Sequence, residues 1–232
     1  MSSDSFRNLI QVAGIASLEE ARMLVDCGVK YLGFPLHLPV HQEDLSEEEA
    51  ARISRSLVDP CRAVAITYQD GASEIAELSR LLDAGMVQLH GDIAVGQLAR
   101  LKLIRPDLQV VKSLIIGLYN LSQLCDMVRA MEPFVDAFIT DTYDAVNGAS
   151  GATGKTHDWE ISRELVAFSA RPVILAGGLT PANVRQAILA VRPAGVDTHT
   201  GVEDVCGKKD GDKVKRFVEQ ADLAFALIHG SC

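Results

Sequence analysis

The chain has 232 residues, of which 48% are hydrophobic and 23% are charged, as in folded globular proteins rather than disordered ones. Its net charge is −9, with 22 basic against 31 acidic residues, and this acidic balance argues against a nucleic-acid partner. No apolar run reaches the ~20 residues of a membrane-spanning helix, and the N-terminus lacks the apolar segment of a signal peptide. We therefore expect a cytoplasmic protein with no membrane partner.

Eight short apolar or β-branched runs are predicted as strands buried on both faces, because they show no strict polar alternation. In chain order they are Leu9–Ala13, Tyr31–Phe34, Ala63–Thr67, Met86–His90, Gln109–Leu114, Ala137–Thr140, Pro172–Ala176 and Gly195–Thr198.

The segments between these runs carry apolar residues at three- and four-residue spacing, which predicts helices. The clearest are Leu18–Cys27, Ser46–Leu57 and Thr180–Val191. Gly28 is a stop signal for the first, and Ser46 with Glu49 predicts a capping box at the start of the second. Thr180 is expected at the N-cap of the third, with Pro181 at its first helical position.

Eight strand–helix units in a chain of this length favour a (β/α)₈ TIM barrel of the α/β class over a doubly wound sheet, which usually has fewer strands. We find no linker and no low-complexity tract. The prediction is a single domain over residues 1–232, with functional groups collected at the C-terminal ends of the strands.

Glycine-containing turns follow the last two predicted strands. Gly177 and Gly178 come after the seventh strand, and Thr200 and Gly201 after the eighth. In barrels these two loops commonly bind phosphate through backbone N–H groups. The alternative is that the glycines merely relax tight turns, but two such turns on adjacent strands favour a phosphate site.

Residues 151–156 read Gly-Ala-Thr-Gly-Lys-Thr and resemble half of a P-loop. A Walker A loop needs a glycine where Ala149 stands, and no strand directly precedes the segment, so nucleotide binding is not expected. We predict instead a mobile loop near residues 144–158 that lies over the barrel mouth and closes on substrate.

Asp141 ends the sixth predicted strand and is a candidate general acid, because burial on a barrel floor raises the pKa of a carboxyl group. Its alternative role is that of a turn residue. Asp197 is also expected to face the pocket. Several histidines near strand ends raise the possibility of a metal site with these aspartates, although no ligand spacing supports one. They are His37, His41, His90 and His199.

The ordered set of motifs at these strand ends resembles the phosphoribosylanthranilate isomerase family of tryptophan biosynthesis, over nearly the whole chain. The most specific pieces are residues 87–91 (VQLHG), 151–159 (GATGKTHDW), 175–183 (LAGGLTPAN), 195–203 (GVDTHTGVE) and 207–210 (GKKD).

The resemblance implies an Amadori rearrangement of a phosphoribosylamine into a ketose, without a cofactor or metal. It implies that Asp141 is the acid and that Asp197 touches the amine region. It places the phosphate on the turns that contain Gly177, Gly178, Thr200 and Gly201. Substrate contacts are further expected from His90, Lys112 and His199.

Two departures from the family pattern fall on the chemistry. The family base is a Cys in a Lys-Ile-Cys-Gly motif, and the corresponding residue here is Ala13, which cannot move a proton. The loop after the second strand lacks the family Arg that pairs with the anthranilate carboxylate, and the next arginine is Arg52. His37 or His41 is a candidate replacement base, because imidazole titrates near working pH.

These departures predict an isomerase of a phosphorylated sugar or sugar-amine with an altered substrate. The alternatives are a true phosphoribosylanthranilate isomerase with a replacement base, a lyase on a sugar phosphate, and a non-catalytic phosphometabolite-binding protein. A homodimer is possible. The residues leave the non-phosphate half of the substrate open.

Overall fold

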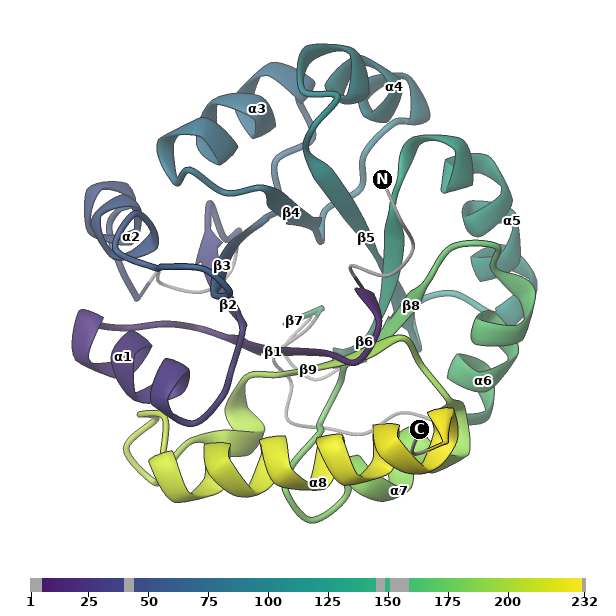
Figure 1. The fold of residues 1–232 in the computed structure, drawn as a ribbon. Helices are drawn as coiled ribbons and strands as arrows, with labels where there is room; N and C mark the ends of the chain where they lie inside the picture. The colour runs from purple at the N-terminus through teal and green to yellow at the C-terminus, as the bar shows by residue number, and fades with distance from the viewer. Residues whose placement is uncertain (1–5, 40–43, 145–148, 151–158, 231–232) are drawn as a thin grey trace.

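Eight parallel strands close into a barrel that is surrounded by helices (Figure 1). The structure is a computed structural model that describes residues 6–39, 44–144, 149–150 and 159–230. Neighbouring strands follow the order β5-β4-β3-β2-β1-β9-β8-β6, and the pairing of β5 with β6 closes the ring. The predicted (β/α)₈ barrel is confirmed.

The barrel strands are β1 (Leu9–Ala13), β2 (Tyr31–Leu36), β3 (Arg62–Thr67), β4 (Met86–Leu89), β5 (Gln109–Ile116), β6 (Ala137–Asp144), β8 (Val173–Leu175) and β9 (Gly195–Thr198). The helices are α1 (Leu18–Asp26), α2 (Glu47–Ser54), α3 (Ala72–Leu81), α4 (Val95–Ile104), α5 (Leu121–Met131), α6 (Trp159–Phe168), α7 (Val184–Val191) and α8 (Gly211–His229). The described ranges also contain the 3₁₀ turns η2 (Glu132–Phe134) and η3 (Thr200–Val202).

The two faces of each barrel strand pack into different cores. On β1, Ile10 and Val12 belong to a large cluster that the strands share with the helices. Leu9 and Ala13, on the other face, belong to a smaller cluster that contains no residue of the eight α-helices and so fills the barrel interior. Because strand side chains alternate, the inward face can be followed along each strand to its polar C-terminal end.

The cap signals in the sequence have mixed outcomes. Ser46 and Glu49 form the predicted capping box at the start of α2. The predicted N-cap role of Thr180 is wrong, because α7 begins only at Val184 with Asn183 at its N-cap. The Asn183 side chain holds the preceding turn, since its Oδ1 accepts from the Thr180 N–H at 2.7 Å and its Nδ2 donates to the Gly178 carbonyl at 3.0 Å.

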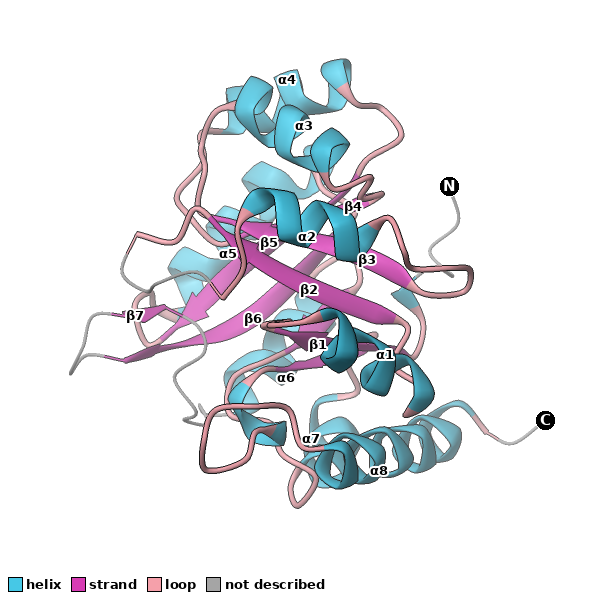
Figure 2. Ribbon diagram, turned by 90° about the vertical axis from the view of Figure 1, so that its left-hand side faces the viewer, coloured by secondary structure: helices cyan, strands magenta, loops and turns pink. Residues whose placement is uncertain are grey.

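Strand β6 runs four residues further than predicted, to Asp144, and pairs antiparallel with the short strand β7 (Ala149–Ser150). Figure 2 shows β7 at the end of the barrel toward which β5 and β6 point, with the last turn of α8 at the opposite end. Most of the predicted mobile loop near 144–158 lies outside the described residues, so its mobility stays a prediction.

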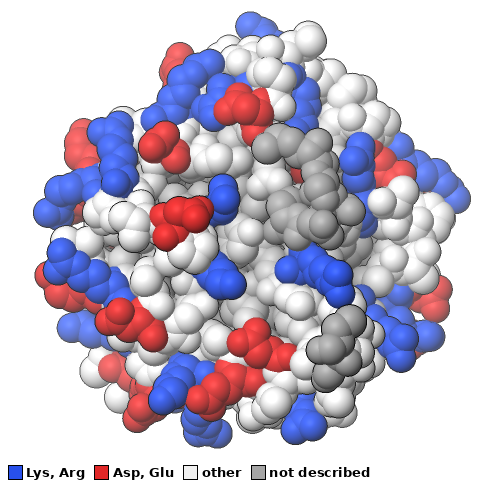
Figure 3. Space-filling model, in the orientation of Figure 1, with Lys and Arg blue, Asp and Glu red and all other residues white. Residues whose placement is uncertain are grey.

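On the face shown in Figure 3, Lys and Arg side chains are interspersed with Asp and Glu rather than gathered by sign. Within the described ranges, no helix combines the length and the apolar character needed to cross a membrane.

Candidate active site

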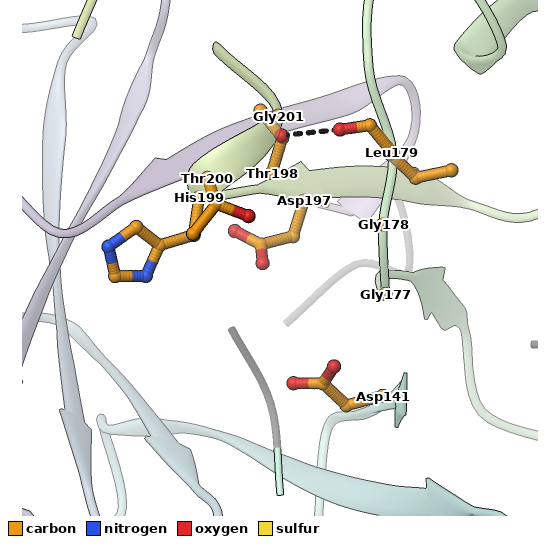
Figure 4. Close-up of a pocket in the computed structure, with 9 residues that line it drawn as sticks. All are labelled: Asp141, Gly177, Gly178, Leu179, Asp197, Thr198, His199, Thr200 and Gly201. Carbon is orange, nitrogen blue, oxygen red and sulfur yellow. Dashed lines mark hydrogen bonds between the residues drawn. The ribbon is translucent and has the colours of Figure 1, made fainter. Parts of the chain in front are cut away.

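A pocket opens at the C-terminal ends of β6, β8 and β9, where the barrel fold predicts functional groups. Seven of the residues singled out in the sequence line it together, from segments far apart in the chain (Figure 4). Leu179 and Thr198 complete the lining. The seven are Asp141, Gly177, Gly178, Asp197, His199, Thr200 and Gly201.

The glycine turns after β8 and β9 form one side of this pocket. Gly177 and Gly178 have φ values of 93° and 64°, a backbone conformation that side chains disfavour. Gly201 approaches the other loop so closely that an added Cβ would lie 1.8 Å from the Leu179 carbonyl oxygen. The Thr198 hydroxyl donates to the same carbonyl at 2.8 Å, so the two loops are held together.

The backbone of the first glycine turn is available to a ligand. Among hydrogen bonds between described residues, neither Gly177 nor Gly178 donates its backbone N–H to a protein group. The Gly178 carbonyl already accepts a hydrogen bond from the Asn183 side chain. The Gly178 N–H is therefore the group that this residue offers to a ligand. Unpaired backbone donors at a glycine turn suit an anion such as phosphate.

The Asp141 carboxyl group is buried at the pocket floor on the inward face of β6, in line with Ala137 and Ile139. Burial raises the pKa of Asp141 to about 7, although a hydrogen bond from the Thr142 N–H opposes the shift. A carboxyl group with this pKa holds a proton at neutral pH and can donate it.

Asp197 faces the same pocket from β9, across from Asp141 (Figure 4). Burial, and secondarily the neighbouring Asp141 charge, raises the pKa of Asp197 to about 7, although a hydrogen bond from Gln11 opposes the shift. The buried Oδ1 of Asp197 has no hydrogen-bond partner among the described residues. A buried acceptor without a partner is costly unless a ligand satisfies it.

A chain of amide and imidazole groups runs across the barrel beside these carboxyls. Gln11 Nε2 donates to Gln88 Oε1 at 2.8 Å, which turns the Gln88 amide nitrogen toward His90 Nε2, 2.6 Å away. His90 therefore accepts at Nε2 and carries its proton on Nδ1, which lies 3.9 Å from Asp141 Oδ2. Burial, and secondarily the Lys112 charge, lowers the pKa of His90 to about 3, so the ring is neutral.

The His199 ring covers the end of β1. An added Cβ on Gly14 would lie 2.1 Å from His199 Nε2, which shows how closely the ring packs there. The same Nε2 lies 3.4 Å from Glu203 Oε1. Lys209 Nζ fixes both partners, because it donates to Glu203 Oε1 at 2.5 Å and to the His199 carbonyl at 3.2 Å.

The other predicted site residues lie outside the pocket lining. His37 follows β2 and is paired with Glu47 through a 2.8 Å contact on a partly exposed surface. His41 falls outside the described residues. Lys112 shares a strand face with Val110 and Leu114, which pack against the helices, and its Nζ donates to the Ser113 carbonyl at 2.9 Å. Burial lowers the pKa of Lys112 to about 8. The roles predicted for these residues stay predictions.

Four polar residues that contact the site were missed from the sequence. Gln11 and Gln88 precede Ala13 and His90 by two positions, so the two-residue alternation of a strand could have found them. Glu203 is four residues from His199, a spacing that allows contact through one helical turn. Lys209 has no such local signal. Among the described residues, no group of three or more His, Cys, Asp or Glu side chains is placed to hold a metal ion.

Comparison with known proteins gives one consistent result. Residues 10–220 match the family model of N-(5'-phosphoribosyl)anthranilate (PRA) isomerase. The chain is 39% identical to N-(5'-phosphoribosyl)anthranilate isomerase 2 of Methanosarcina mazei, and the match covers 94% of this chain and 96% of that one.

Solved structures agree. The phosphoribosylanthranilate isomerase of Thermotoga maritima superposes with a TM-score of 0.78 at 30% identity, over 93% of this chain and 98% of that one. A second isomerase structure, 28% identical with a TM-score of 0.76 and the same coverage, was solved in complex with reduced 1-(o-carboxyphenylamino)-1-deoxyribulose 5-phosphate.

Proposed function

The chain belongs to the N-(5'-phosphoribosyl)anthranilate isomerase family, and on that premise we propose that it converts a phosphoribosylamine with an altered nitrogen substituent into the corresponding ketose amine. It is an intramolecular isomerase of this family's type. The observation that carries the proposed chemistry is the buried Asp141 carboxyl, whose pKa is raised to about 7 in the pocket that also holds the glycine turns.

The first chemical step is the opening of the sugar ring. In its protonated form, Asp141 gives its proton to the ring oxygen as the C1–O bond breaks, and the nitrogen lone pair forms a C1=N double bond. The nitrogen then carries a positive charge. Asp197, in its ionised form on the opposite side of the pocket, is placed to stabilise that cation.

The phosphate end of the substrate is assigned to the glycine turns. The unpaired N–H groups of Gly177 and Gly178 support this assignment, as does the close approach of Gly201 to the adjoining loop. Backbone donors bind the phosphate without specifying the rest of the molecule, so this part of the site suits any 5-phosphoribosylamine.

The nitrogen substituent is proposed to differ from anthranilate, because the loop after β2 has no arginine. Each charge-assisted hydrogen bond to a carboxylate contributes roughly 1.5–3 kcal/mol. Without that pairing, the ortho-carboxylate of anthranilate gains no specific partner from the loop, and amines that lack the carboxylate become equally good substituents.

The experiment that tests the function uses [1-¹³C]ribose 5-phosphate condensed with aniline or with anthranilate. The ketose product is recognised by ¹³C NMR, because its C1 becomes a CH₂ group. We expect conversion by the unaltered protein and a rate lower by about 10²–10⁴ for Asp141→Asn, which cannot donate the proton. The matched control is phosphate binding, which Asp141→Asn should leave unchanged. Absence of the product signal with both amines would contradict the proposal.

A further inference from the structure

The isomerisation proposed above requires a base that removes the proton from C2 of the sugar, and Ala13 carries no group that accepts a proton. Among the described residues that line the pocket, three side chains are titratable: Asp141, Asp197 and His199. Asp141 begins the reaction protonated as the acid. Within the described lining, the candidates for the base are therefore Asp197 and His199.

The strand register separates these two residues by depth. Gln11 of β1 is paired with Asp197 of β9, and Val12 with Thr198. His199 directly follows the end of β9, and its ring packs against Gly14, the residue after Ala13. The inward face of β1 contains Gln11 and Ala13, so Asp197 belongs to the deeper layer and His199 to the upper one. His199 thus enters the pocket at the level of Ala13.

The surroundings of His199 orient its ring as a base requires. Nε2, Cε1 and Cδ2 are the ring atoms nearest to Gly14, so Nδ1 lies on the edge turned away from β1. Glu203 lies 3.4 Å from Nε2 and is itself fixed by Lys209. A carboxylate at Nε2 favours the tautomer that carries its proton there, and in this tautomer the ring lone pair is on Nδ1. In Figure 4 the ring stands beside the Asp197 carboxyl at the pocket edge.

We infer that His199, oriented by Glu203, is the catalytic base that takes the C2 proton; this inference rests on the proposed function. After ring opening, His199 Nδ1 removes the proton from C2. The C2–H electrons form a C1=C2 double bond, and the C1=N electrons return to nitrogen as its lone pair. The resulting enol-amine becomes the ketose when its O2 proton is lost and C1 gains a proton. C2 is oxidised and C1 reduced within one molecule, so no outside oxidant or reductant takes part.

Asp197 is better suited to the nitrogen than to C2. Among the described residues its Oδ1 has no hydrogen-bond partner, and Asp197 lines the same pocket as Asp141. If Asp197 took the C2 proton, its carboxylate charge would be lost while the adjacent nitrogen still carries positive charge in the transition state. This loss of charge is avoided when Asp197 stabilises the nitrogen cation and a different group takes the C2 proton.

The test compares His199→Ala with the unaltered protein, on the phosphoribosylamine of aniline as probe. We expect kcat to fall by about 10²–10⁴, with phosphate binding unchanged. Added imidazole should restore part of the rate, and the rescued rate should vary with the pKa of substituted imidazoles. Glu203→Gln should show a smaller loss, because it keeps the size but not the charge of the partner. The matched control is His229→Ala, at the exposed end of α8, with an unchanged rate.

Each outcome separates the inference from the function on which it rests. No turnover by the unaltered protein would contradict the proposed function. Turnover that survives His199→Ala within about threefold would overturn the base assignment alone. A loss that imidazole does not rescue, in a variant that still binds phosphate, would assign His199 a structural role and also overturn it. Nitrogen-15 NMR gives a readout independent of activity: we expect the proton on Nε2, and a proton on Nδ1 would contradict the inference.

Discussion

At the scale of single residues, the site depends on two carboxyl groups that are buried where their ionised form is destabilised. Asp141 and Asp197 are both buried, and neither has a neutralising cation at hydrogen-bond distance among the described residues. Burial raises the pKa of both carboxyl groups, and the Asp141 charge contributes to the raised pKa of Asp197. The same arrangement that provides a proton donor near neutral pH therefore destabilises the folded chain once these groups ionise.

This gives a prediction on stability and pH. Because the folded pKa of Asp197 is about 7 and its ordinary value is 3.8, folding favours the protonated form. The stability that this preference provides is present below pH ~4 and is lost as the pH rises toward 7. Asp197→Asn should therefore gain on the order of 1–4 kcal/mol over the unaltered protein between pH 5 and pH 8.

Urea unfolding of both proteins at these two pH values measures the gain. The pKa of His90 is shifted in the opposite direction, because burial lowers it. The stability that the neutral His90 ring contributes to the fold is lost as the pH falls from 6.5 toward 3. The difference between Asp197→Asn and the unaltered protein removes the His90 contribution to first order. A stability difference that does not change with pH would show that Asp197 ionises normally in the fold.

The sequence predicts part of the residue-scale site. Asp141 and Asp197 could be placed because each lies within one residue of the end of a predicted strand, where the barrel fold collects functional groups. The partners of His90 and His199 depend on contacts across the barrel. Gln11 meets Gln88 across 77 residues of chain, and Lys209 reaches Glu203 through a loop whose path no local pattern determines.

At the scale of elements, the loops after β8 and β9 are held together, because the Leu179 carbonyl of the first loop contacts residues at and beyond the end of β9. Thr198 donates to it, and Gly201 packs against it without room for a side chain. Gly201→Ala should force the loops apart and lower phosphate affinity by at least about tenfold, which corresponds to ~1.4 kcal/mol. Titration of inorganic phosphate, followed by backbone amide NMR, measures this effect.

The matched control for that substitution is Gly96→Ala in α4, where an added Cβ meets nothing within 4 Å. This variant should bind phosphate normally and gain up to about 1 kcal/mol of stability, because alanine favours helix over glycine. Equal phosphate affinity in both variants would show that the phosphate lies elsewhere on the barrel.

The elements also show why sequence prediction succeeds for strands and fails at their ends. The bounds of β1 and β9 are as predicted, since buried apolar runs define them. Strand β6 extends further because β7 pairs with its end, a partner found only in three dimensions. Helix α7 starts at Val184 rather than directly after Thr180, because the Asn183 side chain stabilises a turn before it. A Thr-Pro pair in the sequence is compatible with either a turn or a helix start.

At the scale of the whole molecule, the chain has the fold of its family, and the proposed difference in substrate rests on two positions of the sequence. The barrel superposes on the phosphoribosylanthranilate isomerase of Thermotoga maritima over 93% of this chain and 98% of that one. The proposed change of substrate rests on Ala13 and on the loop after β2, which has no arginine; we propose that the first affects proton transfer and the second carboxylate recognition. A homodimer stays a prediction.

Restoring the two family residues should have unequal effects on anthranilate turnover. Ala13→Cys alone should change kcat/KM little, because the carboxylate still lacks an anchor. Adding an arginine in the loop, as His41→Arg, should help more, and the double variant most, by roughly tenfold or above. The rate with the aniline derivative serves as the internal control, since it has no carboxylate to bind. An equal gain for both substrates would show that the arginine acts through something other than carboxylate recognition.

The measurement that tests the central claim most directly is the ratio of kcat/KM for the phosphoribosylamines of anthranilate and of aniline, in the unaltered protein. The two compounds differ only in the ortho-carboxylate. If the chain keeps the family chemistry but has lost recognition of that group, the ratio is near one, within about threefold. A preference for anthranilate of roughly 10-fold or more, the value of one charge-assisted hydrogen bond, would contradict the account.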